Sequence, residues 1–336
     1  MGESTGPLSS LSNSFSVMIR EMLAVVDFAA LLTDPAFYGM GVKRGDGRMV
    51  LVLPGLFGSD LYLQPLNHWL RCIGYSPVSS QIEFNAGCLH RLRTEILGQI
   101  KRRLDGDARP IVLIGHSRGG VLAWALASIF QERVSHLVLL GAPVASFMIS
   151  IESGTATIPI GGVSRTLMRA STMARRMIDP DCEYPRCDCP FVRDVMLPLS
   201  PRTSVLSIHG RNDLIVPKDA QISETETIFV NASHVGLVYS PEVYRALSSR
   251  GVASRRVSSS LRRAQPGRER SLPSVGFYAR PSGRWAQAHN LEHSVIGYGT
   301  NVRVPFLMLL FSFLEVTRVI VTLPILFEVN STSTIF

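Results

Sequence analysis

IVLIGHSRGG, residues 111–120, is the stretch of the sequence that decides the fold. Its four leading aliphatic residues predict a buried β-strand, and residues 121–130 continue with apolar residues at helical spacing. Between strand and helix lies a G-x-S-x-G pattern, which places a serine on a sharp strand-to-helix turn. Glycine suits the flanking positions because a Cβ there would strike the neighbouring strand or helix. The pattern therefore predicts Ser117 as a nucleophile.

Two further residues stand where a serine nucleophile needs partners. Asp213 follows a strand-like run at residues 204–209, and His234 follows another at residues 227–230. Taken singly, the aspartate would be a turn former and the histidine a surface-loop residue. The order serine, aspartate, histidine along the chain, with each residue at a predicted strand end, instead favours a catalytic triad of Ser117, Asp213 and His234.

With these residues the chain resembles the α/β-hydrolase superfamily, in particular its bacterial lipase- and esterase-like members. Four motifs carry the resemblance over about residues 45–250: LPGLFGSD at 53–60, GHSRGG at 115–120, GRND through Val216 and Pro217 at 210–217, and SHVGL at 233–237. The resemblance implies the α/β-hydrolase fold, which combines a mainly parallel sheet, flanking helices and a lid insertion.

Apolar patterning independently favours a parallel sheet with helices on both faces. Aliphatic strands are predicted at residues 49–53 and 134–140, with a shorter one over 75–84. Helices are predicted over 61–73 and 89–104, the second because Leu92, Ile96 and Ile100 recur at a spacing of four. Strands that alternate with helices in this way are typical of an α/β fold.

The family resemblance also implies an oxyanion hole, made by the backbone N–H groups of Leu56 and Arg118. One departure from the family pattern is Pro54, which stands where many lipases have a histidine. The departure changes a side chain and leaves the backbone donors in place. It therefore bears on the substrate class and not on the chemistry.

The triad and the resemblance together predict a serine hydrolase that cleaves carboxylic esters through an acyl-enzyme, acting on a small-molecule ester or a lipid. Two alternatives stay open: an acyltransferase with the same triad, and a non-catalytic, membrane-tethered protein of the same fold. The complete triad argues against the second alternative. No cofactor and no metal are expected, because the sequence has no G-x-x-x-x-G-K, no H-E-x-x-H and no G-x-G-x-x-G after a strand.

The N-terminal region divides into two segments. Residues 1–14 are rich in serine and glycine and are predicted to be disordered, whereas the hydrolase domain is expected over residues 15–250. The domain would begin with an amphipathic helix from Val17 to Leu32. Three charged residues interrupt that apolar stretch: Arg20, Glu21 and Asp27. It therefore predicts no secretory signal, and the expected location is cytoplasmic or membrane-associated.

The alternation of strands and helices stops between residues 142 and 200, where the resemblance places a lid. This insertion holds five of the eleven methionines. Their flexible side chains suit an apolar surface that fits variable acyl groups, although ordinary helix packing is the simpler explanation for any one of them. The insertion also holds Cys182, Cys187 and Cys189. Their crowded spacing favours plain thiols or a locally stapled loop over a metal or redox site.

Composition changes sharply after the predicted domain. Nine arginines and one acid between Arg250 and Arg284 account for the whole net charge of +8. Residues 251–303 are therefore predicted to be a basic, low-complexity linker within a poorly ordered C-terminal tail. No aromatic residue interleaves with the arginines before Phe277, so nucleic acid is not expected as a partner.

An apolar segment follows at residues 304–329. It is long enough as a helix to cross a hydrocarbon layer of ~30 Å, although Glu315 and Arg318 lie near its centre. A spanning anchor, an interfacial hairpin and a helix packed on the domain all stay open. Membrane association through this segment is the favoured hypothesis, in keeping with a mean hydropathy of +0.20 and 46% hydrophobic residues.

Overall fold

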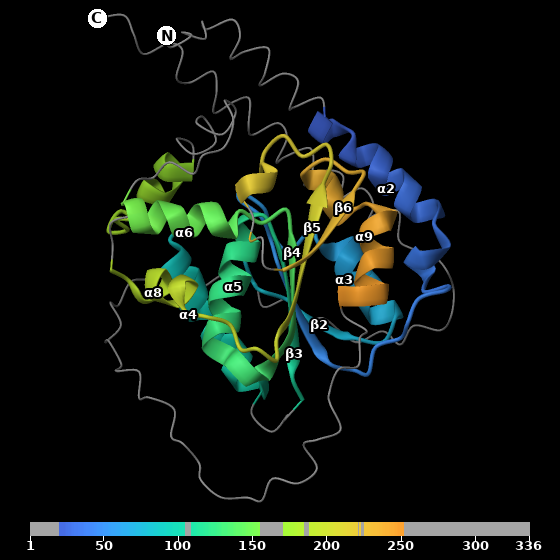
Figure 1. Ribbon diagram of the computed structural model, residues 1–336, viewed down its shortest axis with the longest axis horizontal. Helices are drawn as coiled ribbons and strands as arrows, with labels where there is room; N and C mark the ends of the chain where they lie inside the picture. The colour runs from blue at the N-terminus through green and yellow to red at the C-terminus, as the bar shows by residue number, and fades with distance from the viewer. Residues whose placement is uncertain are drawn as a thin grey trace, which may run out of the picture. The chain divides into compact units, whose positions relative to one another are not determined.

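A parallel β-sheet lies at the centre of the fold (Figure 1). The computed structural model describes residues 20–104, 109–154, 171–184, 188–220, 222 and 225–251. In this part of the chain the sheet has six strands, in the order β2-β1-β3-β4-β5-β6. The strands are β1 (Met49–Leu53), β2 (Ser76–Val78), β3 (Ile111–His116), β4 (Val134–Leu140), β5 (Ser204–Gly210) and β6 (Glu226–Val230). All neighbouring pairs are parallel, which confirms the predicted sheet.

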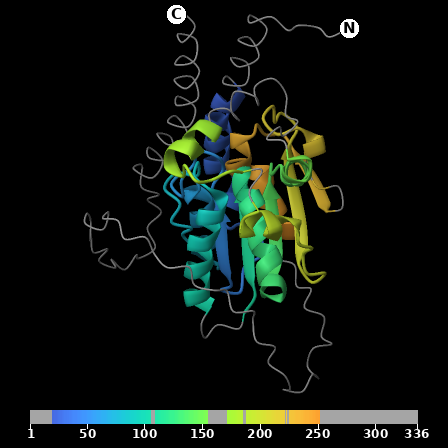
Figure 2. The same cartoon turned by 90° about the vertical axis from the view of Figure 1, so that its left-hand side faces the viewer.

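Helices cover both faces of the sheet (Figures 1 and 2). One face carries α2 (Ala24–Thr33), α3 (Gln64–Cys72) and α9 (Pro241–Ala246). The other carries α4 (Leu89–Leu104), α5 (Arg118–Phe130), α6 (Val144–Ser153) and α8 (Pro190–Met196). The structure also contains short helical turns: η1 (Pro35–Tyr38), η2 (Gln131–Arg133), η3 (Lys218–Ala220), η4 (Val235–Val238) and η5 (Leu247–Gly251).

The central strand β3 explains why its sequence is aliphatic throughout. Val112 and Ile114 pack into the core under α2, α3 and α9, whereas Ile111 and Leu113 pack into the core under α4 and α5. Successive strand residues point to opposite faces, so a sheet covered on both sides buries all of them. Every residue of β3 is buried.

Of the strand predicted over residues 75–84, only the first part forms a strand in the structure. The observed strand β2 ends at Val78, because the next residues bind a side chain and not the sheet. Ser79 Oγ donates to Asp60 Oδ2 at 2.5 Å, and the Ser80 hydroxyl bonds to the same carboxylate. Gln81 then adopts a φ of 58°. These contacts turn the chain into the loop that precedes α4.

The described part of the insertion between β4 and β5 consists of helices joined by turns and irregular stretches. It contains α6, a helix at residues 171–178, and α8. Met173 and Met177 are 52% and 75% exposed, so these two methionines are not core residues. Cys182 is a free thiol, and Cys187 lies outside the described residues.

Three predicted segments fall outside the described residues: the N-terminal segment 1–14, nearly all of the basic linker 251–303, and the apolar segment 304–329. Within the part of the chain that the structure describes, no helix combines the length and the apolar character needed to cross a membrane.

Candidate active site

Ser117 sits between the end of β3 and the start of α5, as the motif predicted. Its backbone has φ 53° and ψ −123°, a combination that non-glycine residues rarely adopt and that stores strain. Its N–H donates to the carbonyl oxygen of Leu140 at the end of β4, at 2.8 Å. The turn is therefore held by the neighbouring strand, and the serine stands at the carboxyl edge of the sheet.

The flanking glycines are required by close backbone contacts. A Cβ on Gly115 would lie 2.4 Å from the Cα of Gly120. A Cβ on Gly119 would lie 2.4 Å from the carbonyl oxygens of both Leu53 and Pro54, where β1 ends. Since real Cβ contacts essentially never fall below 3.0 Å, neither position accepts a side chain without movement of the backbone.

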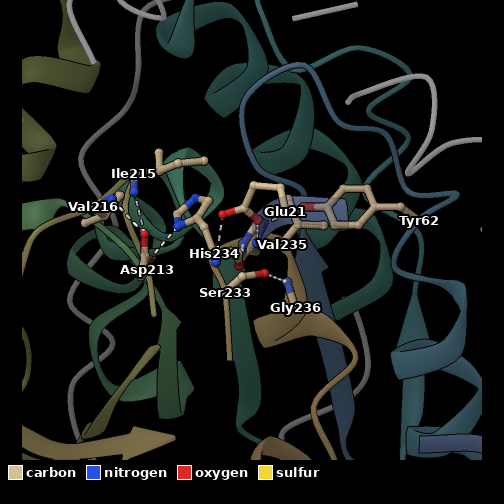
Figure 3. Close-up of polar contacts among 10 residues, drawn as sticks. Glu21, Tyr62, Asp213, Ile215, Val216, Ser233, His234, Val235 and Gly236 are labelled. Atoms are coloured by element: carbon tan, nitrogen blue, oxygen red, sulfur yellow. Dashed lines mark hydrogen bonds and ion pairs between the residues drawn. The ribbon is translucent and has the colours of Figure 1, made fainter. Parts of the chain in front are cut away.

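Asp213 and His234 are in direct contact, as Figure 3 shows. Asp213 Oδ2 lies 2.7 Å from His234 Nδ1, and both side chains are almost fully buried. The other carboxylate oxygen accepts the backbone N–H groups of Ile215 and Val216, each at 2.8 Å. Because an ionised carboxylate only accepts, the proton of His234 belongs on Nδ1. The Nε2 atom is then free to act as a base.

Neighbouring charges raise the pKa of His234 above its ordinary value. Burial alone would lower that pKa, but Asp213 and, to a smaller extent, Glu21 outweigh it by stabilising the imidazolium. Burial would conversely raise the pKa of Asp213, whereas His234 and the two backbone donors bring it below its ordinary value. Each member of the pair thus favours the charged form of the other.

A second histidine, His116, connects Ser117 to the loop after β6 that carries His234, here called the histidine loop. The His116 ring lies 4.9 Å from that of His234, and its Nε2 bonds to the His234 carbonyl oxygen at 3.0 Å. A carbonyl oxygen can only accept, so the His116 proton is on Nε2. Burial, followed by the charge of His234, lowers the pKa of His116 to about 3, and the ring stays neutral.

Tyr62 continues this chain of hydrogen bonds toward the loop after β1. Its hydroxyl lies 2.9 Å from His116 Nδ1, which lacks a proton and therefore accepts from it. The same hydroxyl oxygen accepts the N–H of Gly55 at 2.6 Å. A continuous series of hydrogen bonds thus connects the loop after β1 to the histidine loop. It runs through Gly55, Tyr62, His116 and His234.

In residues 55–58 of the loop after β1, three of the four backbone N–H groups are bonded and that of Leu56 is not. The N–H of Gly55 is taken by Tyr62, that of Phe57 by the Asn85 carbonyl at 3.0 Å, and that of Gly58 by the Gly55 carbonyl at 3.1 Å. Among the described residues no acceptor takes the N–H of Leu56 or of Arg118. Two unbonded backbone donors, one in the loop after β1 and one directly after Ser117, match the number that an oxyanion hole uses.

Asn85 holds both sides of this candidate oxyanion hole. It is fully buried, and its Nδ2 donates to the Pro54 carbonyl at 2.7 Å. Its Oδ1 accepts from the Arg118 guanidinium, which also donates to the Gly87 carbonyl. Burial lowers the pKa of Arg118 to about 10, which still leaves a cation at neutral pH. The Arg118 side chain therefore anchors its own backbone.

Glu21 is a second buried carboxylate at the histidine loop, and only 1% of it is exposed. Its Oε1 accepts the N–H of His234 at 3.2 Å, and its Oε2 accepts the N–H of Val235 at 2.7 Å. In Figure 3 the residue lies on the side of His234 away from Asp213. Sequence reasoning noted Glu21 only as a charge that interrupts an apolar stretch.

The described part of the chain contains no group of three or more histidine, cysteine, aspartate and glutamate side chains placed to hold a metal ion. The polar groups around Ser117 are instead committed to one another by the hydrogen bonds above. His116, the residue before the strained Ser117, is hydrogen-bonded to the His234 carbonyl on one side and, through Tyr62, to Gly55 on the other.

Comparison with known proteins gives one family match. A family described as "alpha/beta hydrolase fold" matches residues 50–160, which run from β1 past the end of α6. No curated protein sequence matches the chain.

Similar solved structures include lipases and esterases. A monoacylglycerol lipase of Paleococcus ferrophilus is 17% identical, with 62% of this chain and 95% of that chain covered and a TM-score of 0.40. An esterase of Thermogutta terrifontis is 18% identical, with 61% and 89% covered and a TM-score of 0.38. Polyneuridine aldehyde esterase, in a mutant form, is 14% identical, with 60% and 97% covered and a TM-score of 0.41.

Proposed function

This chain has the α/β-hydrolase fold, and on that premise we propose that it is a serine hydrolase that cleaves carboxylic esters. In this proposal Ser117 is the nucleophile, His234 the general base and acid, and Asp213 the carboxylate that orients His234. The observation that supports it best is the buried Asp213–His234 pair, which leaves the Nε2 atom of His234 free. The backbone of His234 is in turn bonded to His116, the residue before the strained Ser117.

The proposed chemistry has two halves. Ser117 Oγ attacks the ester carbonyl while His234 Nε2 takes its proton, and the tetrahedral oxyanion accepts hydrogen bonds from the N–H groups of Leu56 and Arg118. Collapse of this intermediate breaks the ester bond, and His234 returns the proton to the departing alcohol. Water then repeats the sequence on the acyl-enzyme, releasing the acid and restoring Ser117.

The oxyanion donors fit this role because they are fixed before charge develops. Each such donor contributes ~3 kcal/mol to transition-state stabilisation in related chemistry. Leu56 is held by the bonded amides on either side of it, and Arg118 by its own side chain through Asn85 and Gly87. Neither donor has to reorient during the reaction.

We further propose that the insertion at residues 142–200 forms a lid that selects the acyl group. The exposed side chains of Met173 and Met177 support this assignment, since flexible apolar side chains at a surface suit variable apolar substrates. The proposal is consistent with a lipid or small-molecule ester as the substrate.

The experiment is labelling of the full-length protein with a fluorophosphonate probe, which reacts covalently with an activated serine. We expect labelling of Ser117, loss of labelling in Ser117→Ala, and equal loss in His234→Ala, in which the serine is present but not activated. Ser249→Ala, which changes an exposed serine, serves as the matched control. Labelling that survives Ser117→Ala would contradict the assignment.

A series of p-nitrophenyl esters from acetate to palmitate would then define the substrate. We expect Ser117→Ala to lower kcat by about a thousandfold or more on the best of them. Addition of an alcohol as acceptor separates hydrolysis from acyl transfer, because only an acyltransferase forms mainly the new ester.

A further inference from the structure

We propose that Glu21 is a positioning residue for His234, so that the N-terminal helical segment is part of the catalytic machinery. The inference rests on the proposed function, because it concerns how the general base is held. Glu21 itself touches neither Ser117 nor the reacting atoms. It would act through the backbone of the histidine loop.

The first support is the geometry of the carboxylate. Its two oxygens accept two successive backbone N–H groups, those of His234 and Val235, at 3.2 and 2.7 Å (Figure 3). Bonds to both oxygens fix the carboxylate plane as well as its position. A glutamine in this place could accept on one side only, and its NH₂ group would face the other N–H.

The second support is that His234 is held at every other polar atom. Its carbonyl accepts from His116 Nε2, its N–H donates to Glu21, and its Nδ1 bonds to Asp213. These three contacts come from β3, from the helical residues 20–22 before α2, and from the loop after β5. Nε2, the atom that must exchange a proton with Ser117, is the one that the three contacts leave unused.

The third support is that the segment carrying Glu21 is firmly docked. Glu21 lies in the helical residues 20–22 that precede α2, and in α2 Ala24 and Leu31 are buried in the core. The Phe28 ring packs 5.2 Å from that of Tyr239, just beyond the turn η4 that follows His234. Helix packing therefore presses Glu21 against the histidine loop.

The charges around His234 give this contact a measurable consequence. Two carboxylates, Asp213 and Glu21, raise the pKa of His234, while His116 beside it is neutral. Burial raises the pKa of Glu21, followed by a smaller effect of Asp213, and the charge of His234 and the two N–H bonds oppose the rise. Removing the negative charge at residue 21 should thus lower the pKa of His234.

The experiment compares full-length wild type with Glu21→Gln, measuring both p-nitrophenyl acetate hydrolysis and the rate of fluorophosphonate labelling across pH. In Glu21→Gln we expect kcat to fall about tenfold because the imidazole is less well placed. The acidic limb of kcat/KM should move to lower pH, because the general base has lost a stabilising charge. A purely structural role would reduce thermal stability without moving that limb.

Two further variants sharpen the comparison. Glu21→Asp keeps the charge but shortens the side chain, so it should lower kcat and leave the acidic limb in place; it also stands in if Glu21→Gln does not fold. Glu242→Gln is the matched control, because Glu242 also accepts a backbone N–H, that of Asn231, close to the same loop. It should leave both kcat and the limb unchanged.

The outcomes are separable. If wild type is labelled at Ser117 while folded Glu21→Gln keeps the wild-type kcat and acidic limb, the positioning role is wrong and the proposed function stands. If only Glu21→Asp folds and it keeps the wild-type kcat, the positioning role is equally wrong. If wild type is not labelled at Ser117, the proposed function itself fails.

Discussion

At the scale of single residues, the site is organised around polar atoms that are already committed. His234 has one free ring nitrogen because Asp213 takes the other. Ser117 adopts strained dihedrals in a turn whose close backbone contacts accept only glycine at positions 115 and 119. The candidate oxyanion donors are the two amides that their surroundings leave unbonded. Preorganisation of this kind stabilises developing charge without any reorientation during the reaction.

The first prediction is a pH profile. A protonated His234 cannot act as a base, and the pKa of His234 lies above 6.5 because Asp213 and Glu21 outweigh the opposing effect of burial. On a neutral ester, kcat/KM should therefore rise with pH and reach half its maximum above 6.5. Stopped-flow or plate-based initial rates across pH 5 to 9 would measure this (a range chosen to bracket ordinary histidine titration). A midpoint clearly below 6.5 would contradict the assigned environment of His234.

As pH rises through the pKa of His234, the free energy of unfolding should decrease while activity increases. A raised histidine pKa contributes to folding below its unfolded value of 6.5, and the contribution is lost as pH rises through the folded value. The lowered Asp213 pKa contributes above 3.8 and is lost as pH falls further. The Asp213–His234 pair therefore stabilises the fold most between pH 3.8 and pH 6.5, the unfolded-state values of the two groups.

Sequence reasoning could name the residues that lie in short motifs and could not name their supports. Ser117, Asp213 and His234 each follow a strand and belong to recognisable local patterns. Glu21 is 213 positions from His234, and Tyr62 is 54 positions from His116. Nothing in the local sequence marks such long-range hydrogen bonds, because they depend on how the elements pack.

At the scale of elements, the spacing of apolar residues was enough to predict those strands and helices whose structure depends on burial alone. The continuous aliphatic run of β3 and the four-residue repeat of α4 both correspond to observed elements. The loop after β2 was less predictable, because the Ser79 and Ser80 side chains bind Asp60 and end the strand early. That loop carries Asn85 to the candidate oxyanion hole.

The second prediction concerns this loop. Asn85→Ala should lower kcat roughly tenfold or more, because the Pro54 carbonyl and the Arg118 side chain both lose their common partner. It should also destabilise the fold by about 1–3 kcal/mol, as expected when buried polar groups lose their bonds. Ester hydrolysis and thermal denaturation, measured on the same preparations, test the two effects.

Asn67→Ala provides a control for Asn85→Ala. Asn67 is also a buried asparagine, but it lies in α3, and its Oδ1 has no partner among the described residues. It should alter stability without altering kcat. Equal loss of kcat in the two variants would mean that Asn85 acts only through general stability.

At the scale of the whole molecule, the residues that follow α9 are packed against the rest of the domain. Leu247 is fully buried, and the Ser248 hydroxyl accepts the N–H of Lys43 at 2.9 Å. Arg250 pairs with Glu226 of β6 at 2.9 Å. The turn η5 is therefore part of the packed structure, and a truncation at Leu247 would remove residues that the core uses.

The last prediction places the cut after Gly251. The protein ending there keeps the proposed triad, the candidate oxyanion hole and the η5 contacts, so it should retain kcat and thermal stability close to those of the full chain. The full chain should bind anionic vesicles, because each arginine near such a surface contributes ~1 kcal/mol. Salt screens that term but leaves the transfer of an apolar segment unaffected, so binding should persist in high salt.

Vesicle co-sedimentation of the two proteins, at low and high salt, measures both effects. A protein cut after Leu247 should differ from the one cut after Gly251 by lower thermal stability, since it lacks the Ser248 and Arg250 contacts. If the full chain stayed in the supernatant while the Gly251 truncation lost stability, the apolar segment 304–329 would be acting as part of the folded domain. Membrane association through that segment would then be wrong, and the proposed chemistry at Ser117 would be untouched, because it depends only on residues up to 251.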